Sequence, residues 1–277
     1  MLTTFFSLVF KRSFIRQKRS TFKMKKKQKK GDVLAIQDLF LAGVHLGHDR
    51  QDWNPKMLPY IHSTQNGQHV LDLEKTLPLL RRATNFLTKV SEQNENIVFV
   101  GTKNSEIAQI TKITAKITNQ SYIATRWVHG MLSNWEAVSN SIHELNEFEK
   151  RLSYLQDTWP ERKKKGKNPS ISEVLSSSFS PSVRRRYKRL KYLFDGVRNL
   201  KNLPSVIVIL DDLNHHKLII DEARRKHIAI IGIVDSNSNP DDIHFPIPGN
   251  DDSLKSVHLY AKQLSKACIE GELNRIC

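Results

Sequence analysis

Three short runs of aliphatic residues, separated by helical patterns, restrict the fold of this chain more than any other feature. They read NIVFVG at residues 96–101, SVIVILD at 205–211 and IAIIGIVD at 228–235. A strand that is apolar on both faces is typical of a parallel sheet buried between helices. Because the crossovers between parallel strands are right-handed, the sequence predicts a three-layer α/β domain with a mainly parallel sheet.

Helices and turns around these strands are predicted from spacing. Leucines and one threonine (Thr84) that recur every three or four positions predict a helix over residues 73–87, where Pro78 is tolerated only in the first turn. Asn66-Gly67 is a favoured hairpin turn and predicts two short strands beside it. HLGH (45–48) and the segment after Asp235 are predicted to be loops. In SEIAQITKITAKI, isoleucines at helical spacing are predicted to form the buried face of a helix: Ile107, Ile110, Ile113 and Ile117.

A change in the spacing of apolar residues over residues 133–198 predicts an insertion. Apolar residues follow a heptad-like spacing from Ser133 to Leu155, and the same spacing returns from Val183 to Val197. Ser133 with Glu136 forms a possible capping box at the start. The segment between the two stretches is polar and rich in helix breakers. The sequence therefore predicts a helical hairpin with coiled-coil packing, inserted into an α/β domain formed by residues 32–132 and 199–277.

The overall charge predicts a polyanionic partner. The formal net charge is +16, with 44 Lys and Arg residues against 28 Asp and Glu residues. Such an excess favours nucleic acid first and an anionic membrane surface second. No apolar run approaches the roughly 20 residues of a membrane-spanning helix, so the chain is not expected to span a membrane. Nucleic acid is preferred, and no membrane partner is predicted. The two cysteines, Cys268 and Cys277, argue against a disulfide scaffold, and Cys268 is interpreted as a packing residue.

Residues 1–31 hold 11 of the Lys and Arg residues and no acidic residue. Aromatic and aliphatic side chains lie among the cations, together with several hydroxyl groups, and this composition is typical of an organelle-import peptide. A disordered basic arm that contacts RNA phosphates has the same composition. The two interpretations are compatible, because one segment can do both.

Three places resemble sites of chemistry, and each has a simpler interpretation. Gly101 and Lys103 follow a strand, but the second glycine and the Lys-Ser/Thr pair of a phosphate-binding loop are absent. His45 and His48 are spaced like metal ligands but lack further ligands nearby. The loop Asp235–Asp252 lies where α/β enzymes bind ligands, yet its Asp and Asn side chains also serve turns and helix caps. We predict no catalytic residue, no cofactor and no metal.

Basic residues interleaved with aromatic ones are the candidates for nucleic-acid contact. RKKKGK (162–167) lies near the tip of the predicted hairpin, and RRRYKRLK (184–191) runs along its second helix. WNPK (53–56) and RW (126–127) are predicted in loops, where an indole can stack and a cation can meet phosphate. The predicted RNA-binding residues are Trp53, Lys56, Lys103, Arg126, Trp127, Arg184, Arg185 and Lys188.

Several motifs taken together resemble a known family. The segments AGVHLGH, WNPKMLPYI, LDLEKT, FVGTK, RWVHGMLSNW, LPSVIVILD, IVDSNSNPD and IPGNDD occur in the order of the bacterial-type small-subunit ribosomal protein S-two family, near its spacings. The resemblance covers residues 33–271. It implies a Rossmann-like domain that bears a coiled-coil hairpin. It also implies a place on the small ribosomal subunit, bound to ribosomal RNA and neighbouring proteins, with no catalytic activity and no small-molecule substrate.

The sequence departs from the family pattern at two glycine pairs. His129 precedes Gly130 where two glycines are usual, and Asp195 precedes Gly196 at the second pair. A side chain in place of glycine suggests a locally shifted backbone near Arg126. The segment KITNQSYI resembles mitochondrial members more than plastid members. Together with the basic leader, it favours a mitochondrion over a plastid.

The leading hypothesis is a structural constituent of an organellar small ribosomal subunit, located in the mitochondrial matrix. It would bind ribosomal RNA as Lys and Arg displace counterions from phosphates. The alternative is an α/β enzyme that acts on a phosphorylated or nucleotide substrate through the Asp235–Asp252 loop. A third hypothesis, a free RNA-binding factor, differs only in location.

Overall fold

Five parallel strands form the central sheet, in the order β5-β4-β6-β7-β8. Every residue of β4 and β6 is buried, and the two strands pair in register, with Val98 opposite Ile207. This sheet confirms the predicted α/β class with a parallel sheet. The strands are β4 (Ile97–Val100), β5 (Ser121–Ile123), β6 (Val206–Ile209), β7 (Ala229–Val234) and β8 (Phe245–Pro248).

The computed structural model describes residues 34–158 and 170–276. The predicted leader (1–31) and the cluster RKKKGK lie outside these residues. From Ile36 onward the chain forms one compact unit. In the two described stretches, no helix combines the length and the apolar character needed to cross a membrane.

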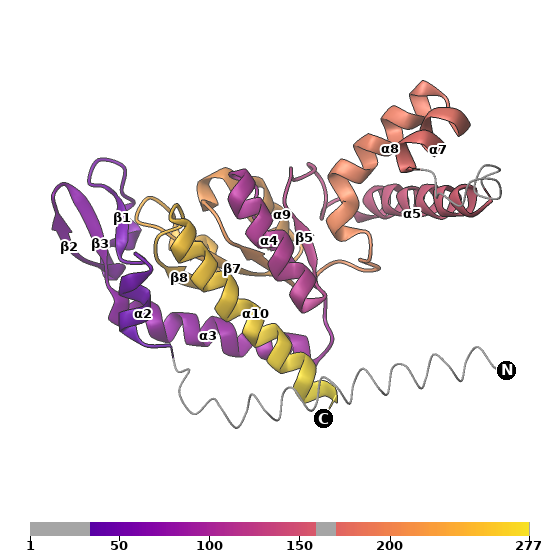
Figure 1. The fold of residues 1–277 in the computed structure, drawn as a ribbon. Helices are drawn as coiled ribbons and strands as arrows, with labels where there is room; N and C mark the ends of the chain where they lie inside the picture. The colour runs from indigo at the N-terminus through magenta and orange to yellow at the C-terminus, as the bar shows by residue number, and fades with distance from the viewer. Residues whose placement is uncertain (1–33, 159–169, 277) are drawn as a thin grey trace. The chain divides into compact units, whose positions relative to one another are not determined.

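Helices cover both faces of the sheet (Figure 1). The helix α4 (Ser105–Thr118) leads from β4 to β5, and α9 (Lys217–Arg225) leads from β6 to β7 in the opposite direction along the sheet. Right-handed crossovers therefore place them on opposite faces. The C-terminal helix α10 (Leu254–Ile276) packs against α4 and against α3 (Leu73–Glu92). The result is the predicted three-layer, Rossmann-like arrangement.

A second, antiparallel sheet of three strands has the order β1-β3-β2. β2 (Ile61–Gln65) and β3 (Gln68–Leu71) are the predicted hairpin, and Asn66 and Gly67 at its turn have φ of 51° and 84°. β1 (Leu46–Asp49) overlaps HLGH (45–48), so the prediction of a loop there is wrong. Its four residues show no clear apolar alternation, because the strand is held mainly by pairing with β3.

β8 corrects a second predicted loop. Phe245–Pro248 lies inside the Asp- and Asn-rich segment and pairs in parallel with β7, with Val234 opposite Pro248. Prolines usually argue against a strand because they lack an N–H donor. At the edge of a sheet, however, the outward-facing positions need no donor, so Pro246 and Pro248 fit there.

The buried face of α4 differs from the predicted one. Ile113 and Ile117 are 50% and 60% exposed, and three threonines are buried in their place. The hydroxyl of Thr111 donates to the carbonyl of Ile107 at 2.8 Å, and the other buried threonines bond in the same way, one turn back. Because these hydroxyls are satisfied within the helix, threonine can occupy the core side. In α3, Pro78 lies in the second turn rather than the first.

The insertion contains three described helices where two were predicted. α5 (Trp135–Asp157) contacts both α7 (Ile171–Ser178) and α8 (Pro181–Phe194). α7 lies in the segment predicted to be a polar linker. It forms because Ser170 and Glu173 make a reciprocal capping box and because Val174 and Leu175 are buried.

The capping box predicted at the start of the insertion is absent. α5 begins after Asn134 without a side-chain cap. The backbone N–H of Ser133, which lies before the helix, is 3.4 Å from the carboxylate of Glu222. That residues 133–198 form a domain of their own, with coiled-coil packing, stays a prediction.

Candidate nucleic-acid interface

Acidic side chains gather where the strands of the central sheet end. Asp235 follows β7, and Asp251 and Asp252 follow β8; both Asp235 and Asp251 are buried. The ring of His48 bridges two of them, with Nδ1 3.3 Å from Asp235 and Nε2 3.3 Å from Asp252. The hydrogen bond to Asp235 raises the pKa of His48 to about 9, so the imidazole is cationic at neutral pH.

Asp251 is the unusual member of this cluster. Neither of its carboxylate oxygens has a hydrogen-bond partner among the described residues, and burial followed by the charge of Asp235 raises its pKa. One ligand atom each of His48, Asp235 and Asp251 lie within 4.8 Å of one another, but a cationic imidazole has no free lone pair for a metal ion. His45, the partner suggested by HLGH, instead stacks on a phenylalanine ring.

In the loop between β4 and α4, a carboxylate of the protein itself occupies the backbone N–H groups. Asp211, fully buried at the end of β6, accepts hydrogen bonds from the backbone N–H groups of Thr102 and Lys103 at 2.7 and 2.8 Å. Its other oxygen bonds to the ring of His216. In a nucleotide-binding loop such N–H groups point at phosphate. Here they are already satisfied, which argues against a nucleotide site.

The predicted cations near the ends of the strands are paired within the chain. The ammonium of Lys56 lies 2.7 Å from Asp241, and that of Lys103 contacts Asp252. Trp53 is half-buried, with its ring tilted against His69 at 5.3 Å. The structure thus brings these residues to one side of the sheet but gives each cation an acidic partner.

Glu222 holds the loop that carries Arg126 and Trp127. The carboxylate, almost fully buried on α9, accepts the backbone N–H groups of Gly130 at 2.8 Å and Leu132 at 2.9 Å. Burial alone would raise the pKa of Glu222, but these donors hold the pKa below its usual value. Gly130 supplies the positive φ of 81° that the loop requires.

This clamp decides how the loop presents its two candidate residues. Arg126 is exposed, whereas Trp127 is half-buried, packs against the core and has its indole nitrogen 3.5 Å from Glu222. Glu222 was not among the predicted residues. It is 92 positions from Gly130, and a glutamate within a helical pattern gives no signal of a buried contact.

The basic helix α8 differs from the other candidates. Arg185, Lys188 and Arg189 are exposed, and in the described part of the chain they form no ion pair; the half-buried Arg184 forms none either. Arg186, in contrast, binds Glu144 through two contacts of 2.6 and 2.7 Å. The predicted residues Arg184, Arg185 and Lys188 therefore lie together on one helix, with their charges uncompensated.

These features define a class of protein. It is a Rossmann-like α/β protein in which a buried aspartate occupies the backbone N–H groups of the loop after β4. Its helix α8 carries exposed cations that have no ion pair among the described residues. The chain matches the family described as Ribosomal protein S2 over residues 39–271 and belongs to that family. The resemblance seen in the sequence is thereby confirmed. Members of the family are structural proteins of the ribosome, in agreement with the prediction that this chain is not an enzyme.

Relatives in several bacteria are named small ribosomal subunit protein uS2. The one from Buchnera aphidicola is 41% identical over 234 residues, which are 84% of this chain and 90% of the relative. The one from Agrobacterium fabrum is 35% identical over 237 residues, 86% of each chain. The one from Pseudoalteromonas atlantica is 36% identical, over 88% of this chain and 93% of the relative. The family is therefore the bacterial type.

Proposed function

We propose that this chain is a structural constituent of the small ribosomal subunit and that it binds ribosomal RNA and neighbouring ribosomal proteins there. The names of its relatives support this role. The observation that carries the RNA contact is the group of uncompensated cations on α8. Such cations release counterions when they meet phosphates, and this release supplies much of the affinity for a nucleic acid.

The proposed ribosome is that of a mitochondrion, with a plastid as the alternative. The support is the composition of residues 1–31, which hold 11 cations and no acidic residue. The resemblance of KITNQSYI to mitochondrial members adds to it. A leader that directs import and a basic arm that contacts RNA stay compatible roles for this segment.

The predicted RNA-binding residues fall into three groups within this proposal. On α8, Arg185 and Lys188 are exposed and available without any rearrangement, whereas Arg184 is half-buried. Arg126, Trp127 and Trp53 lie in loops that the fold holds in place. Lys56 and Lys103 must exchange an aspartate for a phosphate, so their net contribution to RNA affinity is smaller.

Sedimentation of organelle extracts tests the proposed role. The full chain, tagged at its C-terminus and expressed in its own cells, is expected to sediment with the small ribosomal subunit of purified mitochondria, before and after a high-salt wash. A chain that leaves the particle in high salt would be a loosely bound RNA-binding factor. A chain that stays at the top of the gradient at every salt concentration overturns the proposal, and recovery in plastids corrects its location.

The alternative of an α/β enzyme is not supported. The relatives of this chain are ribosomal proteins. The Asp211 carboxylate also occupies the backbone N–H groups of Thr102 and Lys103, which a phosphorylated substrate would need. The segment Asp235–Asp252 forms an edge strand and a buried cluster instead of an open catalytic loop.

A further inference from the structure

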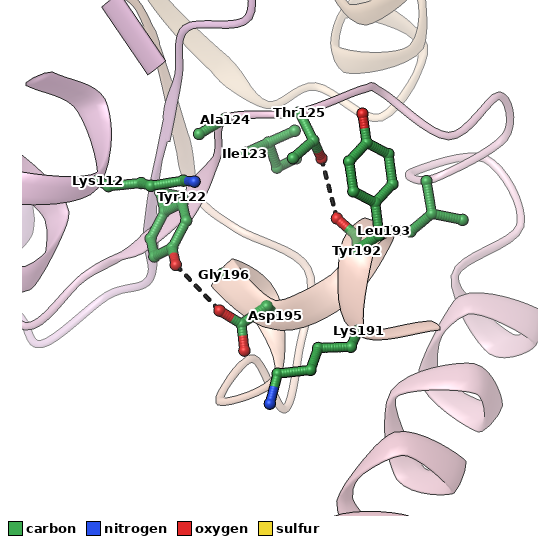
Figure 2. A pocket seen from close by; sticks show the side chains of 10 residues that line it. All are labelled: Lys112, Tyr122, Ile123, Ala124, Thr125, Lys191, Tyr192, Leu193, Asp195 and Gly196. Atoms are coloured by element: carbon green, nitrogen blue, oxygen red, sulfur yellow. Dashed lines mark hydrogen bonds between the residues drawn. The ribbon is translucent and has the colours of Figure 1, made fainter. Parts of the chain in front are cut away.

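A small cavity lies where the end of α8 meets the edge strand β5. Figure 2 shows Lys112 and Tyr122 on one side of it and Tyr192 and Leu193 on the other. Its volume is about 170 Å³, below the roughly 300–1,000 Å³ of sites that enclose a whole small molecule. The cavity therefore suits one planar ring rather than a complete metabolite.

The lining of the cavity has the chemistry of a nucleobase site. Two tyrosine rings and apolar side chains offer stacking and packing surfaces, and the Asp195 carboxylate, held by the Tyr122 hydroxyl at 3.2 Å, is an acceptor for base N–H groups. Asp195 also lies 3.9 Å from Arg198. The hydroxyl of Thr125 donates to the carbonyl of Tyr192 at 3.1 Å and joins the two walls. Single-stranded RNA is recognised by such combinations of stacking and edge contacts.

The cations around the cavity favour a nucleic acid over a neutral aromatic partner. The ammonium of the half-buried Lys112 has no ion pair or hydrogen bond within residues 34–158 and 170–276. Lys191, the other cation at the rim, is held by Glu149 at 2.9 Å. On α8, positions 185, 188, 189 and 192 fall on one face at helical spacing. Tyr192, 61% exposed, thus ends a row of three exposed cations.

We propose that this cavity receives one unpaired base of an RNA strand, which stacks beside Tyr192 while Lys112 contacts the adjoining phosphate. The strand then follows the cations of α8 through its backbone. This inference rests on the proposed function and gives it a defined partner: an unpaired nucleotide, not a continuous duplex. The absence of a side chain at Gly196 is part of the site, because a Cβ there would collide with Tyr122.

The test measures binding of the full chain to a fluorescent single-stranded oligoribonucleotide, with a duplex of equal length as the comparison probe. Tyr192→Ala is expected to weaken single-strand binding by about 5- to 100-fold, the contribution of one base–aromatic stack, and to leave duplex binding unchanged. Tyr192→Phe retains the ring and should restore binding. Tyr154→Ala removes another exposed tyrosine of the insertion, 67% exposed, and should have no effect.

Lys112→Ala is expected to reduce the slope of log affinity against log salt by about 0.7, the value for one phosphate of a single strand. Lys116→Ala, one turn further along α4, should leave the slope unchanged. The inference is overturned if Tyr192→Ala binds both probes like the unaltered chain, or if it weakens both equally. Displacement of the single strand by millimolar adenosine monophosphate would assign the cavity to a free nucleotide. If the unaltered chain binds neither RNA, the inference fails, and sedimentation with the small subunit decides separately whether the proposed function fails as well.

Discussion

Basic residues lie both at the carboxyl ends of the central strands and on the helix α8, but the two regions differ in how many of these cations are paired within the chain. Where the strands end, Lys56 is paired with Asp241 and Lys103 with Asp252, and His48 lies between Asp252 and a third aspartate, Asp235. On α8, Arg185 and Lys188 have none among the described residues. The charges at the strand ends are paired within the fold, whereas α8 leaves Arg185 and Lys188 available for a partner, although its Arg186 and Lys191 are also paired. A count of charges cannot separate these two cases.

The largest expected effect tests whether internal charges serve the fold. Glu222→Gln replaces an acceptor of several backbone N–H groups by an amide that can accept only on one side. We expect a loss of about 3 kcal/mol in the free energy of unfolding at neutral pH, since charged hydrogen bonds of a buried group are broken. Urea unfolding measures it, with the exposed Glu92→Gln as the control.

The same variant has a defined pH dependence. Because the folded-state pKa of Glu222 lies below its unfolded value, its stabilisation is present above the unfolded pKa and is lost as the pH falls through the folded pKa. The gap between the variant and the unaltered chain should therefore narrow below about pH 4.3, the ordinary glutamate pKa. A gap that is constant with pH would show that shape, not charge, holds the loop.

The comparison itself is tested by two double variants that remove equal charge. Arg185→Ala with Lys188→Ala should weaken binding to a ribosomal RNA transcript by about 10- to 50-fold. The slope of log affinity against log salt concentration should become shallower by about two. Lys56→Ala with Lys103→Ala should cost only about 2- to 3-fold, since each lysine is already paired. Equal losses in the two variants would contradict the distinction between the regions.

The cluster of His48 with Asp235, Asp251 and Asp252 is expected to stabilise the fold up to alkaline pH. The pKa of His48 is raised to about 9, above its unfolded value of about 6.5. Its stabilisation is therefore complete below the unfolded pKa and is lost as the pH rises through about 9. With allowance for solvent screening, we expect a loss on the order of 1–2 kcal/mol. His48→Gln should lack this loss in urea unfolding between pH 6 and 10.

The smallest expected effect comes from releasing a paired cation of α8 from its ion pair. Glu144→Gln releases Arg186, which should raise RNA affinity by about 2- to 3-fold. Glu147→Gln makes the same change in net charge but releases Lys150, on α5. A gain that is equal in both variants would indicate a general effect of net charge rather than a contact made by α8.

The fold was predictable where burial alone determines the structure. β4, β6 and β7 were found because both of their faces are covered, which leaves a continuous aliphatic run in the sequence. β1 and β8 were missed because pairing with a neighbouring strand fixes them rather than an apolar pattern. The isoleucines of α4 misled for a related reason. Threonine can bond within its own helix, so apolar spacing did not mark the core side.

The candidate site was predictable in part. The run RRRYKRLK pointed to α8 because many cations on one helix cannot all find partners within the chain. Which cations are compensated depends on contacts between distant segments, such as Lys103 with Asp252, 149 positions apart. The cavity beside Tyr192 is built from α4, β5 and the end of α8, and no local motif marks their meeting.

The carboxylate of Asp211 gives the domain a property that a ligand-binding relative of this fold would lack. A bound nucleotide comes and goes with its concentration, and the loop that holds it changes with it. Asp211 is attached to the chain, so its effective concentration at the N–H groups of Thr102 and Lys103 does not vary. The geometry of this loop is therefore insensitive to the energy state of the cell, which suits a part whose shape must be constant through every round of translation.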